Sequence, residues 1–390
     1  MHKTYLDGTH RTRSPGETWE AIQPLLAAFD IPRVADVTGL DDIGIPVAMA
    51  IRPMGRTLSV AQGKGSTLVA ARVSAAMEAI EACHGEYAVP RTGLRTSAER
   101  LGLPYRVTAL EHHPGSLVTK KTIMEWTTGH FVASGAEIPV PVAAIELGRQ
   151  MHSWWRLHLP ASSTNGLASG NTRDEAVSHA LYELIERDVL SELIDPLRPV
   201  AAQRIDSTSV DDPHCSRLIE HLERARVWFE LWSLKNIYGV PVMACYIWRE
   251  DQQAITVSGS GAHLDPSVAL SRAITEAAQT RLTYISGSRE DTHPIAYRPG
   301  VRSAPAHHDV APVAWAEITQ GHARGFSTHG EEALFLAGLI EAKTGVAPIA
   351  VDLVGSWFRD PPFSVVKVLA PCLRYLSHHT VPLPSKAVAA

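Results

Sequence analysis

Apolar residues recur at three- and four-residue spacing in several stretches of the chain, which is the spacing of amphipathic helices. This pattern predicts helices at 17–29, 214–226 and 332–344. The stretches after the first two helices are similar, because residues 34–47 align without a gap on residues 229–242 and both end in Gly-(Ile/Val)-Pro-Val before an apolar run. The sequence therefore predicts an internal repeat.

Each copy of the repeat is interpreted as a helix, a strand, a turn and a second strand. In the first two copies a third strand and a glycine turn lead into a long helix, over 67–84 and over 266–284. The helix at the C-terminal end opens a third copy with looser similarity. A further long helix, 172–190, follows a Ser-Thr-Asn-Gly segment and has Asn171 as its expected cap.

These units predict an α+β fold in which mixed β-sheets pack with helices. We expect a single domain over residues 1–390, with a core at about 10–372 and a flexible C-terminal tail at 373–390. With 45% hydrophobic and 20% charged residues, the composition is that of an ordinary globular protein.

The charge balance argues against nucleic acid and membrane partners, since 36 Lys and Arg stand against 41 Asp and Glu and the net charge is −5. The first residues contain no apolar signal segment, and no stretch approaches about 18 uninterrupted apolar residues. The four cysteines are scattered without a Cys-x-x-Cys pair, which is typical of a reducing compartment. We therefore expect a cytoplasmic protein.

Acidic residues gather on the long helices, where lysines that usually accompany them on solvated faces are absent. Ser74, Glu78 and Glu81 fall on one stripe of the helix at 67–84, among alanines. Arg187 directly follows the acids of the helix at 172–190. Those acids share a related face and are Glu175, Glu183 and Glu186.

Carboxylates that converge without local countercharge repel one another unless cations lie among them, and Mg²⁺ is the hard ion that takes carboxylate and phosphate oxygens. The alternative is that these residues lie on exposed helix faces or form buried ion pairs. Glu276 and Gln279 repeat the same spacing on the third long helix, and this recurrence favours the Mg²⁺ interpretation.

Two further features have a phosphate-binding and a structural interpretation. Residues 62–65, Gln-Gly-Lys-Gly, lead into an acidic helix, where backbone N–H groups can receive phosphate, or they form an ordinary glycine turn. Arg281 and Arg289 could neutralise polyphosphate, or they could pair with Glu290 or Asp291.

Three blocks of the sequence resemble the YcaO family: SVAQGKGSTLVAARVSAAMEAIEACHGEY, STNGLASGNTRDEAVSHALYELIERDVL and ALSRAITEAAQTRLTYISGSRED. The similarity covers most of residues 10–370. It implies a YcaO-like fold and an enzyme that uses ATP and Mg²⁺ to phosphorylate the oxygen of a peptide backbone amide, so that a nucleophile can replace that oxygen.

The resemblance also implies roles for individual residues. The implied Mg²⁺ ligands are Glu78, Glu81, Glu175, Glu183 and Glu186. The implied ATP contacts are Ser74, Asn171, Arg187, Gln279 and Arg289. Arg11 and Thr18 keep the seven-residue spacing of a Lys and Ser pair that contacts nucleotide in the family, with Arg in place of Lys. No residue is assigned as a catalytic group.

The nucleophile differs among members of the family. Azoline-forming members usually end in a Pro-x-Pro-x-Pro tail, whereas this chain has only Pro382-Leu-Pro384 followed by six residues. Its motifs more nearly resemble members associated with TfuA, which use sulfide to form backbone thioamides. We therefore expect thioamide formation with a TfuA-like partner on a ribosomally made precursor peptide or a protein. The alternatives are an azoline-forming cyclodehydratase and a non-catalytic nucleotide-binding scaffold. For the assembly, a homodimer is one alternative.

Overall fold

The computed structural model describes residues 2–148, 157–193, 201–249, 256–292, 310–322, 325–353, 355, 357–358 and 360–374. The chain falls into two compact units. Unit 1 comprises Met1–His2, Ile80–Leu197 and Phe326–Ala390, and unit 2 comprises Lys3–Ala79 and Arg198–Gly325. Because the two units alternate along the chain, the expected single domain stays a prediction, and the expected tail from residue 375 onward lies outside the described residues.

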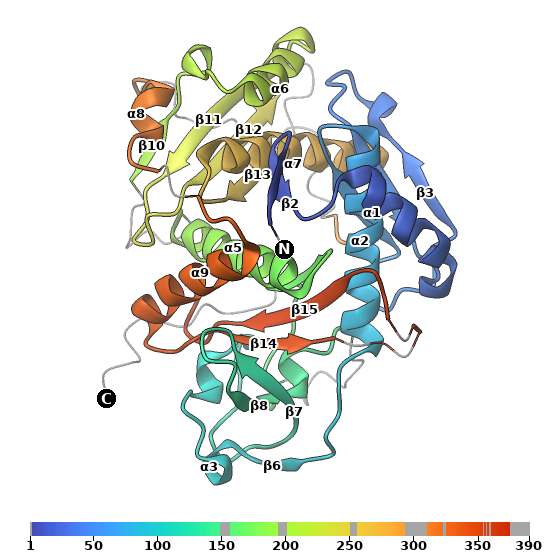
Figure 1. The fold of residues 1–390 in the computed structure, drawn as a ribbon, viewed down its shortest axis with the longest axis vertical. Coiled ribbons are helices and arrows are strands. Elements are labelled where there is room, and N and C mark those ends of the chain that lie inside the picture. The colour runs from blue at the N-terminus through green and yellow to red at the C-terminus, as the bar shows by residue number, and fades with distance from the viewer. Residues whose placement is uncertain are drawn as a thin grey trace. The chain divides into compact units, whose positions relative to one another are not determined.

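Unit 2 contains two successive copies of one arrangement, in which a helix, three antiparallel strands and a long helix follow one another (Figure 1). The first copy is α1 (Pro15–Ile22), β3 (Arg33–Asp36), β4 (Val47–Ile51), β5 (Val60–Lys64) and α2 (Leu68–Tyr87), and the second is α6 (Pro213–Arg224), β11 (Trp228–Leu234), β12 (Val242–Trp248), β13 (Val257–Ala262) and α7 (Pro266–Ser286). The other elements of this unit are β1 (Thr4–Leu6), β2 (Thr9–Arg11), β10 (Ala202–Arg204) and α8 (Trp315–Thr319). The predicted repeat is therefore confirmed.

Local chemistry explains where these helices begin and end. Asp265 caps α7, since its side chain accepts a hydrogen bond from the Ser267 N–H at 2.9 Å. The first predicted helix is shorter than expected, because α1 ends at Ile22 and the chain continues as a 3₁₀ helix over Gln23–Phe29 that has a proline in its first turn. Helix α2 runs through the division between the units, with residues 68–79 in unit 2 and 80–87 in unit 1.

A glycine on the third strand of each copy brings that strand directly onto the long helix. A Cβ on Gly63 would lie 2.0 Å from the Ala75 nitrogen, and a Cβ on Gly259 would lie 2.2 Å from the Ala277 nitrogen. Only glycine permits so close an approach of strand and helix. The Gln-Gly-Lys-Gly segment is therefore the end of strand β5 and its entry into α2, and packing accounts for Gly63.

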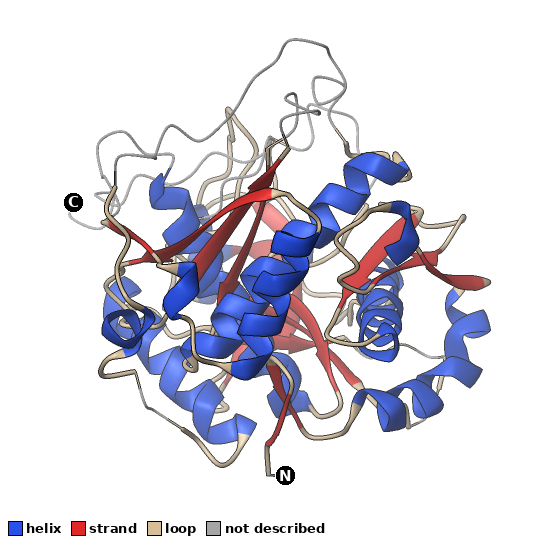
Figure 2. Ribbon diagram, turned by 90° about the horizontal axis from the view of Figure 1, so that it is seen from above, coloured by secondary structure: helices blue, strands red, loops and turns tan. Residues whose placement is uncertain are grey.

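Unit 1 is built around a six-stranded sheet with the order β6-β7-β14-β15-β9, in which β8 also pairs with β7. Its elements are β6 (Arg95–Ser97), α3 (Ala98–Leu101), β7 (Ile123–Phe131), β8 (Glu137–Pro141), β9 (Leu167–Gly170), α5 (Arg173–Leu193), α9 (His329–Thr344), β14 (Ile349–Asp352) and β15 (Ser364–Leu369). Helices and strands of this unit are distinguished by colour in Figure 2.

The predicted third copy is present in unit 1 as α9, β14 and β15. Strand β9 and helix α5 complete it, because β9 pairs with β15 in the register Ser364↔Gly170. Gly170 then contacts α5 as the glycines of unit 2 contact their helices, since its Cβ would lie 2.5 Å from the Ala176 nitrogen. The last strand and helix of this copy thus precede its other elements in the sequence.

The strands pair more uniformly than expected. Every strand pair in the ranges given above is antiparallel, and a single parallel bridge joins Ile205 and Val313. Short connections between consecutive strands explain the antiparallel pairing within β3–β5 and within β11–β13. Strand β7 with β14 and β9 with β15 are antiparallel as well, although they are far apart in the chain, and this differs from the mixed sheets of the prediction. None of the described helices has the length and apolar character needed to cross a membrane.

Candidate functional site

The first candidate residues of unit 1 lie where β9 passes into α5. Thr172 caps the helix, because its hydroxyl accepts a hydrogen bond from the Glu175 N–H at 3.2 Å. Asn171 is therefore not the cap that the sequence predicts, since Thr172 directly precedes the first helical residue. Instead the Asn171 amide donates to Oε1 of Glu175 at 3.1 Å. Glu175 is 2% exposed, so its carboxylate is fixed within the fold.

The other acids of α5 lie two to three turns further along the helix. Glu183 pairs with Arg187 at 3.1 Å, one turn away, and the Glu186 side chain is partly exposed. Asp188 is buried and binds the ammonium group of Lys343 and the Arg374 N–H. The structure thus brings Glu183 and Arg187 together.

Glu81 lies on the part of α2 that belongs to unit 1. One of its carboxylate oxygens accepts hydrogen bonds from the Ser169 N–H at 2.8 Å and from the Ser169 hydroxyl at 2.6 Å. Ser169 is a strand residue of β9, two positions before Asn171. Sequence reasoning missed Ser169, and its place in the Ser-Gly-Asn segment before α5 was the only signal.

In unit 2, Glu78 lies on α2 and its carboxylate is 3.9 Å from the Arg289 guanidinium. Arg289 also donates two hydrogen bonds to Asp291, at 2.9 and 2.6 Å. Hydrogen bonding from Arg289 holds the pKa of Asp291 below its ordinary value. Without nucleotide, Arg289 thus pairs with Asp291, one of its expected acidic partners. Arg281 follows neither alternative, because it forms a buried pair with Asp41 at 2.8 Å.

Residues of α7 contact strand β5 in the same unit. The Gln279 amide donates to the Gln62 carbonyl at 3.2 Å, and the Lys64 ammonium lies 2.5 Å from a Glu276 carboxylate oxygen. Glu276 directly precedes the residue that contacts the strand glycine, as Ser74 does on α2 and Glu175 does on α5. Relative to the strand glycine, Glu276 therefore occupies the position that Ser74 has on α2 and Glu175 has on α5. The Glu-x-x-Glu and Glu-x-x-Gln pairs, which were recognised by their spacing, do not occupy equivalent positions on their helices.

The remaining candidates of unit 2 lie in its N-terminal part. Arg11 ends β2, and Ser74 is a partly exposed residue of α2. Thr18 is buried on α1, and its hydroxyl donates to the Ser14 carbonyl at 3.0 Å. The hydroxyl of Thr18 is thus used within its own helix.

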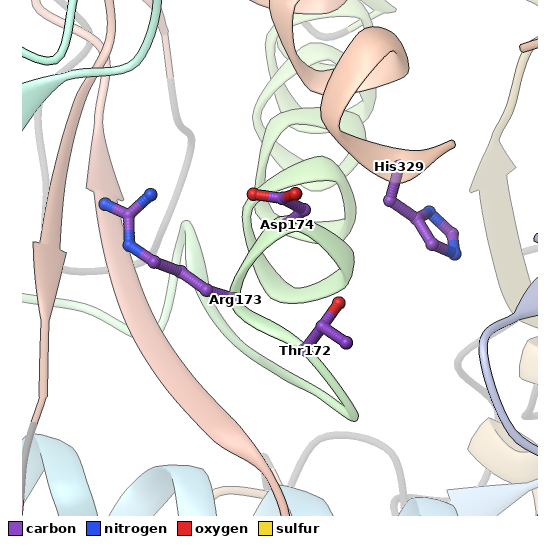
Figure 3. A pocket seen from close by; sticks show the side chains of 4 residues that line it. All are labelled: Thr172, Arg173, Asp174 and His329. Carbon is purple, nitrogen blue, oxygen red and sulfur yellow. The ribbon is translucent and has the colours of Figure 1, made fainter. Parts of the chain in front are cut away.

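A cavity of about 270 Å³ lies beside the start of α5 in unit 1 and is lined by Thr172, Arg173, Asp174 and His329 (Figure 3). His329 begins α9, and the other three residues belong to the start of α5. Arg173 points away from His329 and pairs with Asp352 at 2.6 Å. The cavity therefore has a hydroxyl, a carboxylate and an imidazole in its wall.

Sequence reasoning also missed a buried polar network in unit 1. Lys367 of β15 is 2% exposed and donates to the carbonyl oxygens of Ser163 and Asn165, both at 2.6 Å. Glu111 accepts from the Ser163 hydroxyl at 2.7 Å and from the Asn165 amide at 2.9 Å. Burial lowers the pKa of Lys367, against the charges of Glu111 and Glu183 that raise it. This network fixes the segment that leads into β9.

The donor set fits Mg²⁺ and a nucleotide. In the part of the chain that the structure describes, no three His, Cys, Asp or Glu side chains converge closely enough to hold a metal ion alone. Mg²⁺ is usually held by one or two carboxylates together with phosphate oxygens and water. In unit 1, Glu175 and Glu183 offer such carboxylates and Arg187 offers a guanidinium group that suits phosphate. In unit 2, Glu78 offers a carboxylate and Arg289 a guanidinium group.

Comparisons with known proteins support the expected cofactors, ATP and Mg²⁺. Residues 62–374 match the family model described as YcaO cyclodehydratase, ATP- and Mg²⁺-binding. An uncharacterized protein of Mycobacterium tuberculosis is 35% identical over 374 residues, which are 94% of this chain and 83% of that protein. An uncharacterized protein from the tfuA 3′ region of Rhizobium leguminosarum bv. trifolii is 37% identical over 316 residues, 75% of this chain and 72% of that protein.

Two solved structures share the fold. The YcaO protein from Methanopyrus kandleri, bound with AMPPCP and Mg²⁺, superposes with a TM-score of 0.73 at 22% identity, over 96% of this chain and 95% of that chain. A heterocyclase in complex with substrate and cofactor gives a TM-score of 0.76 at 19% identity, over 96% of this chain. This chain spans 54% of that heterocyclase. The expected fold is thereby confirmed.

Proposed function

Because the chain belongs to the YcaO family, we propose that it uses ATP and Mg²⁺ to activate a peptide backbone amide for replacement of the amide oxygen. The family model confirms ATP and Mg²⁺ as the cofactors. The observation that carries the proposal is the fixed position of the Glu175 carboxylate. Glu175 is buried at the start of α5 and accepts a hydrogen bond from the Asn171 amide. A buried carboxylate in an oxygen-rich segment is suited to a hard cation.

In this proposal the Mg²⁺ ligands are Glu78, Glu81, Glu175, Glu183 and Glu186, with Glu276 as an addition from the structure. ATP supplies the phosphoryl group that turns the amide oxygen into a leaving group. Arg187 and Arg289 stabilise negative charge on the transferring group, and Ser74, Asn171, Gln279, Arg11 and Thr18 orient the nucleotide. The protein's own part is positioning and charge stabilisation.

We further propose that sulfide replaces the oxygen, giving a thioamide with a TfuA-like partner on a precursor peptide or protein. Support comes from the relative encoded beside tfuA in Rhizobium leguminosarum bv. trifolii. The second candidate is azoline formation by a side chain of the substrate, which the cyclodehydratase description of the family favours. Product mass separates them, because exchange of oxygen for sulfur adds about 16 Da and ring closure with loss of water removes about 18 Da.

The binding test is calorimetry of ATP in the presence of Mg²⁺. Glu78→Gln and Glu183→Gln should each weaken ATP binding by at least about tenfold, because each removes a carboxylate that the cation needs. Glu220→Gln, at an exposed position of α6, is the matched control and should bind like the wild type. Unchanged affinity in both site variants would rule out the assignment. Absence of peptide-dependent phosphate release would favour the scaffold role.

A further inference from the structure

The cavity beside the start of α5 contains a histidine with an unused ring nitrogen. The side chain of His329 is 6% exposed, and its Nε2 atom is buried without a hydrogen-bond partner among the described residues. His329 nevertheless lines the cavity of about 270 Å³ (Figure 3). A buried polar atom without a partner costs free energy, and a bound ligand would remove that cost.

The other ring nitrogen shows which ligand would suit. Nδ1 of His329 lies 3.3 Å from Oε2 of Glu332 and 3.1 Å from Oγ of Ser178. The Ser178 hydroxyl donates to the Glu175 carbonyl, and Oε1 of Glu332 accepts from the Tyr182 hydroxyl at 2.8 Å. Both neighbours of Nδ1 are therefore acceptors, and Nδ1 carries the ring proton. With the ring proton on Nδ1, Nε2 offers a lone pair to a ligand.

The nearest carboxylate to this lone pair is one of the proposed Mg²⁺ ligands. Oε2 of Glu175 lies 4.0 Å from Nε2 of His329, which is too long for a hydrogen bond. Metal bonds of about 2.0–2.2 Å to nitrogen and to oxygen allow one ion to contact both atoms. A carboxylate on the second ring nitrogen, here Glu332, is the usual support of a metal-binding histidine.

We propose that His329 is a nitrogen ligand of the divalent cation held at Glu175, and that Glu332 orients its ring. The inference rests on the proposed function, which places a divalent ion at Glu175. Imidazole ligands favour transition-metal ions over Mg²⁺. The wild-type protein should therefore discriminate less against Mn²⁺ than a variant without the imidazole.

The experiment uses the full chain with Mn²⁺ and a non-hydrolysable ATP analogue, and it measures nitrogen coupling to Mn²⁺ by pulsed EPR. In wild-type protein made with ¹⁵N-histidine, the coupling should change from the ¹⁴N to the ¹⁵N pattern, which excludes adenine as its source. In His329→Gln this coupling should be lost and Mn²⁺ affinity should fall by about tenfold or more. His112→Gln is the matched control, since His112 is also buried in unit 1 but bonds to the Val107 carbonyl at 3.0 Å.

Bound Mn²⁺ without histidine coupling in the wild type, or coupling that persists in His329→Gln, would overturn the inference and leave the proposed function standing. A wild-type protein that binds no Mn²⁺ would overturn both. The isotope comparison needs no variant, so it decides the matter even where His329→Gln does not fold. Glu332→Gln is the second variant, and unchanged Mn²⁺ affinity there would contradict the role of Glu332.

Discussion

Glu175 of unit 1 is held differently from the acidic side chains of unit 2 that are proposed to bind the cation. In unit 1, Glu175 is 2% exposed and is hydrogen-bonded by a neutral amide. In unit 2, the side chains of Glu78 and Glu276 are 43% and 36% exposed, and they lie beside Arg289 and Lys64. A buried acid with neutral donors keeps its position without ligand, whereas an exposed acid beside a long cationic side chain can exchange that cation for Mg²⁺.

We therefore expect ligand binding and folding to be coupled to different degrees at these positions. Substitutions in the buried networks of unit 1 should change the free energy of unfolding as well as binding. Substitutions at the exposed pairs of unit 2 should change binding with little effect on unfolding. Each prediction below tests one side of this contrast.

We expect the largest difference in unfolding free energy between two Lys→Met substitutions, one in each unit. Lys367→Met should lower the free energy of unfolding by about 3–5 kcal/mol, because it leaves Glu111 without a buried countercharge and two carbonyl oxygens without their donor. Lys64→Met removes only a partly exposed pair with Glu276 and should cost less than about 1 kcal/mol. Urea unfolding measures both, and equal losses would break the contrast.

The pH dependence of unfolding tests a buried histidine of unit 1. His84 donates to the Ile80 carbonyl at 2.8 Å and packs against Trp357, and its burial lowers its pKa from 6.5 to about 4. Between these values the unfolded chain binds a proton that the folded chain does not. Stability is therefore complete above pH 6.5 and should fall by about 3 kcal/mol as the pH drops toward 4.

The control for this prediction is His84→Gln, which cannot titrate. Its unfolding free energy should vary less with pH over the same interval, when each is measured by urea unfolding at closely spaced pH values. A wild-type protein whose stability is flat between pH 6.5 and 4 would show that His84 titrates normally.

Arg289→Gln in unit 2 should weaken binding of Mg²⁺ and ATP by about tenfold and change the free energy of unfolding by less than about 1 kcal/mol. The reason is that its partners Asp291 and Glu78 are about half exposed and remain hydrated when the guanidinium is removed. Calorimetry and urea unfolding on the same preparation give both values. A large loss of stability with unchanged affinity would show that Arg289 stabilises the fold and does not bind the nucleotide.

The smallest effect is expected at Ser169. Ser169→Ala removes the hydroxyl that donates to Glu81 at 2.6 Å, while the backbone N–H of the same residue still donates at 2.8 Å. We expect a loss of about 1 kcal/mol in unfolding free energy and a few-fold weaker Mg²⁺ affinity. Ser134→Ala, in the turn before β8, is the control and should leave Mg²⁺ affinity unchanged. Identical affinity in both variants would show that Glu81 needs only the backbone donor.

Local pattern was enough to predict the long helices, because their apolar spacing lies within a few residues. The helix expected at 172–190 is Arg173–Leu193, and the one expected at 266–284 is Pro266–Ser286, although Thr172 caps the first in place of Asn171. The pairing of β9 with β15 could not be predicted, since the register Ser364↔Gly170 joins segments far apart in the chain. Strand pairing depends on such distant contacts, which no local pattern records.

The candidate site divides in the same way. The implied pairing of Glu183 with Arg187 follows from their spacing on one helix. The role of Lys367 could not be predicted, because it lies in the apolar run of a strand and its partners Ser163 and Asn165 are about 200 residues away in the chain. The spacing identified Glu276 but not its correspondence to Ser74 and Glu175, because spacing alone does not record where each helix crosses its strand glycine.

The order of elements in the third copy has a consequence for synthesis on the ribosome. Strand β9 and helix α5 leave the ribosome about 190 residues before β15, which is the neighbour that β9 needs in the sheet. The second copy, in contrast, is contiguous from Pro213 to Ser286 and can pair its strands as soon as they emerge. Until β15 emerges, a nascent chain therefore carries β9 and the acidic segment of α5 without the strand that pairs with β9.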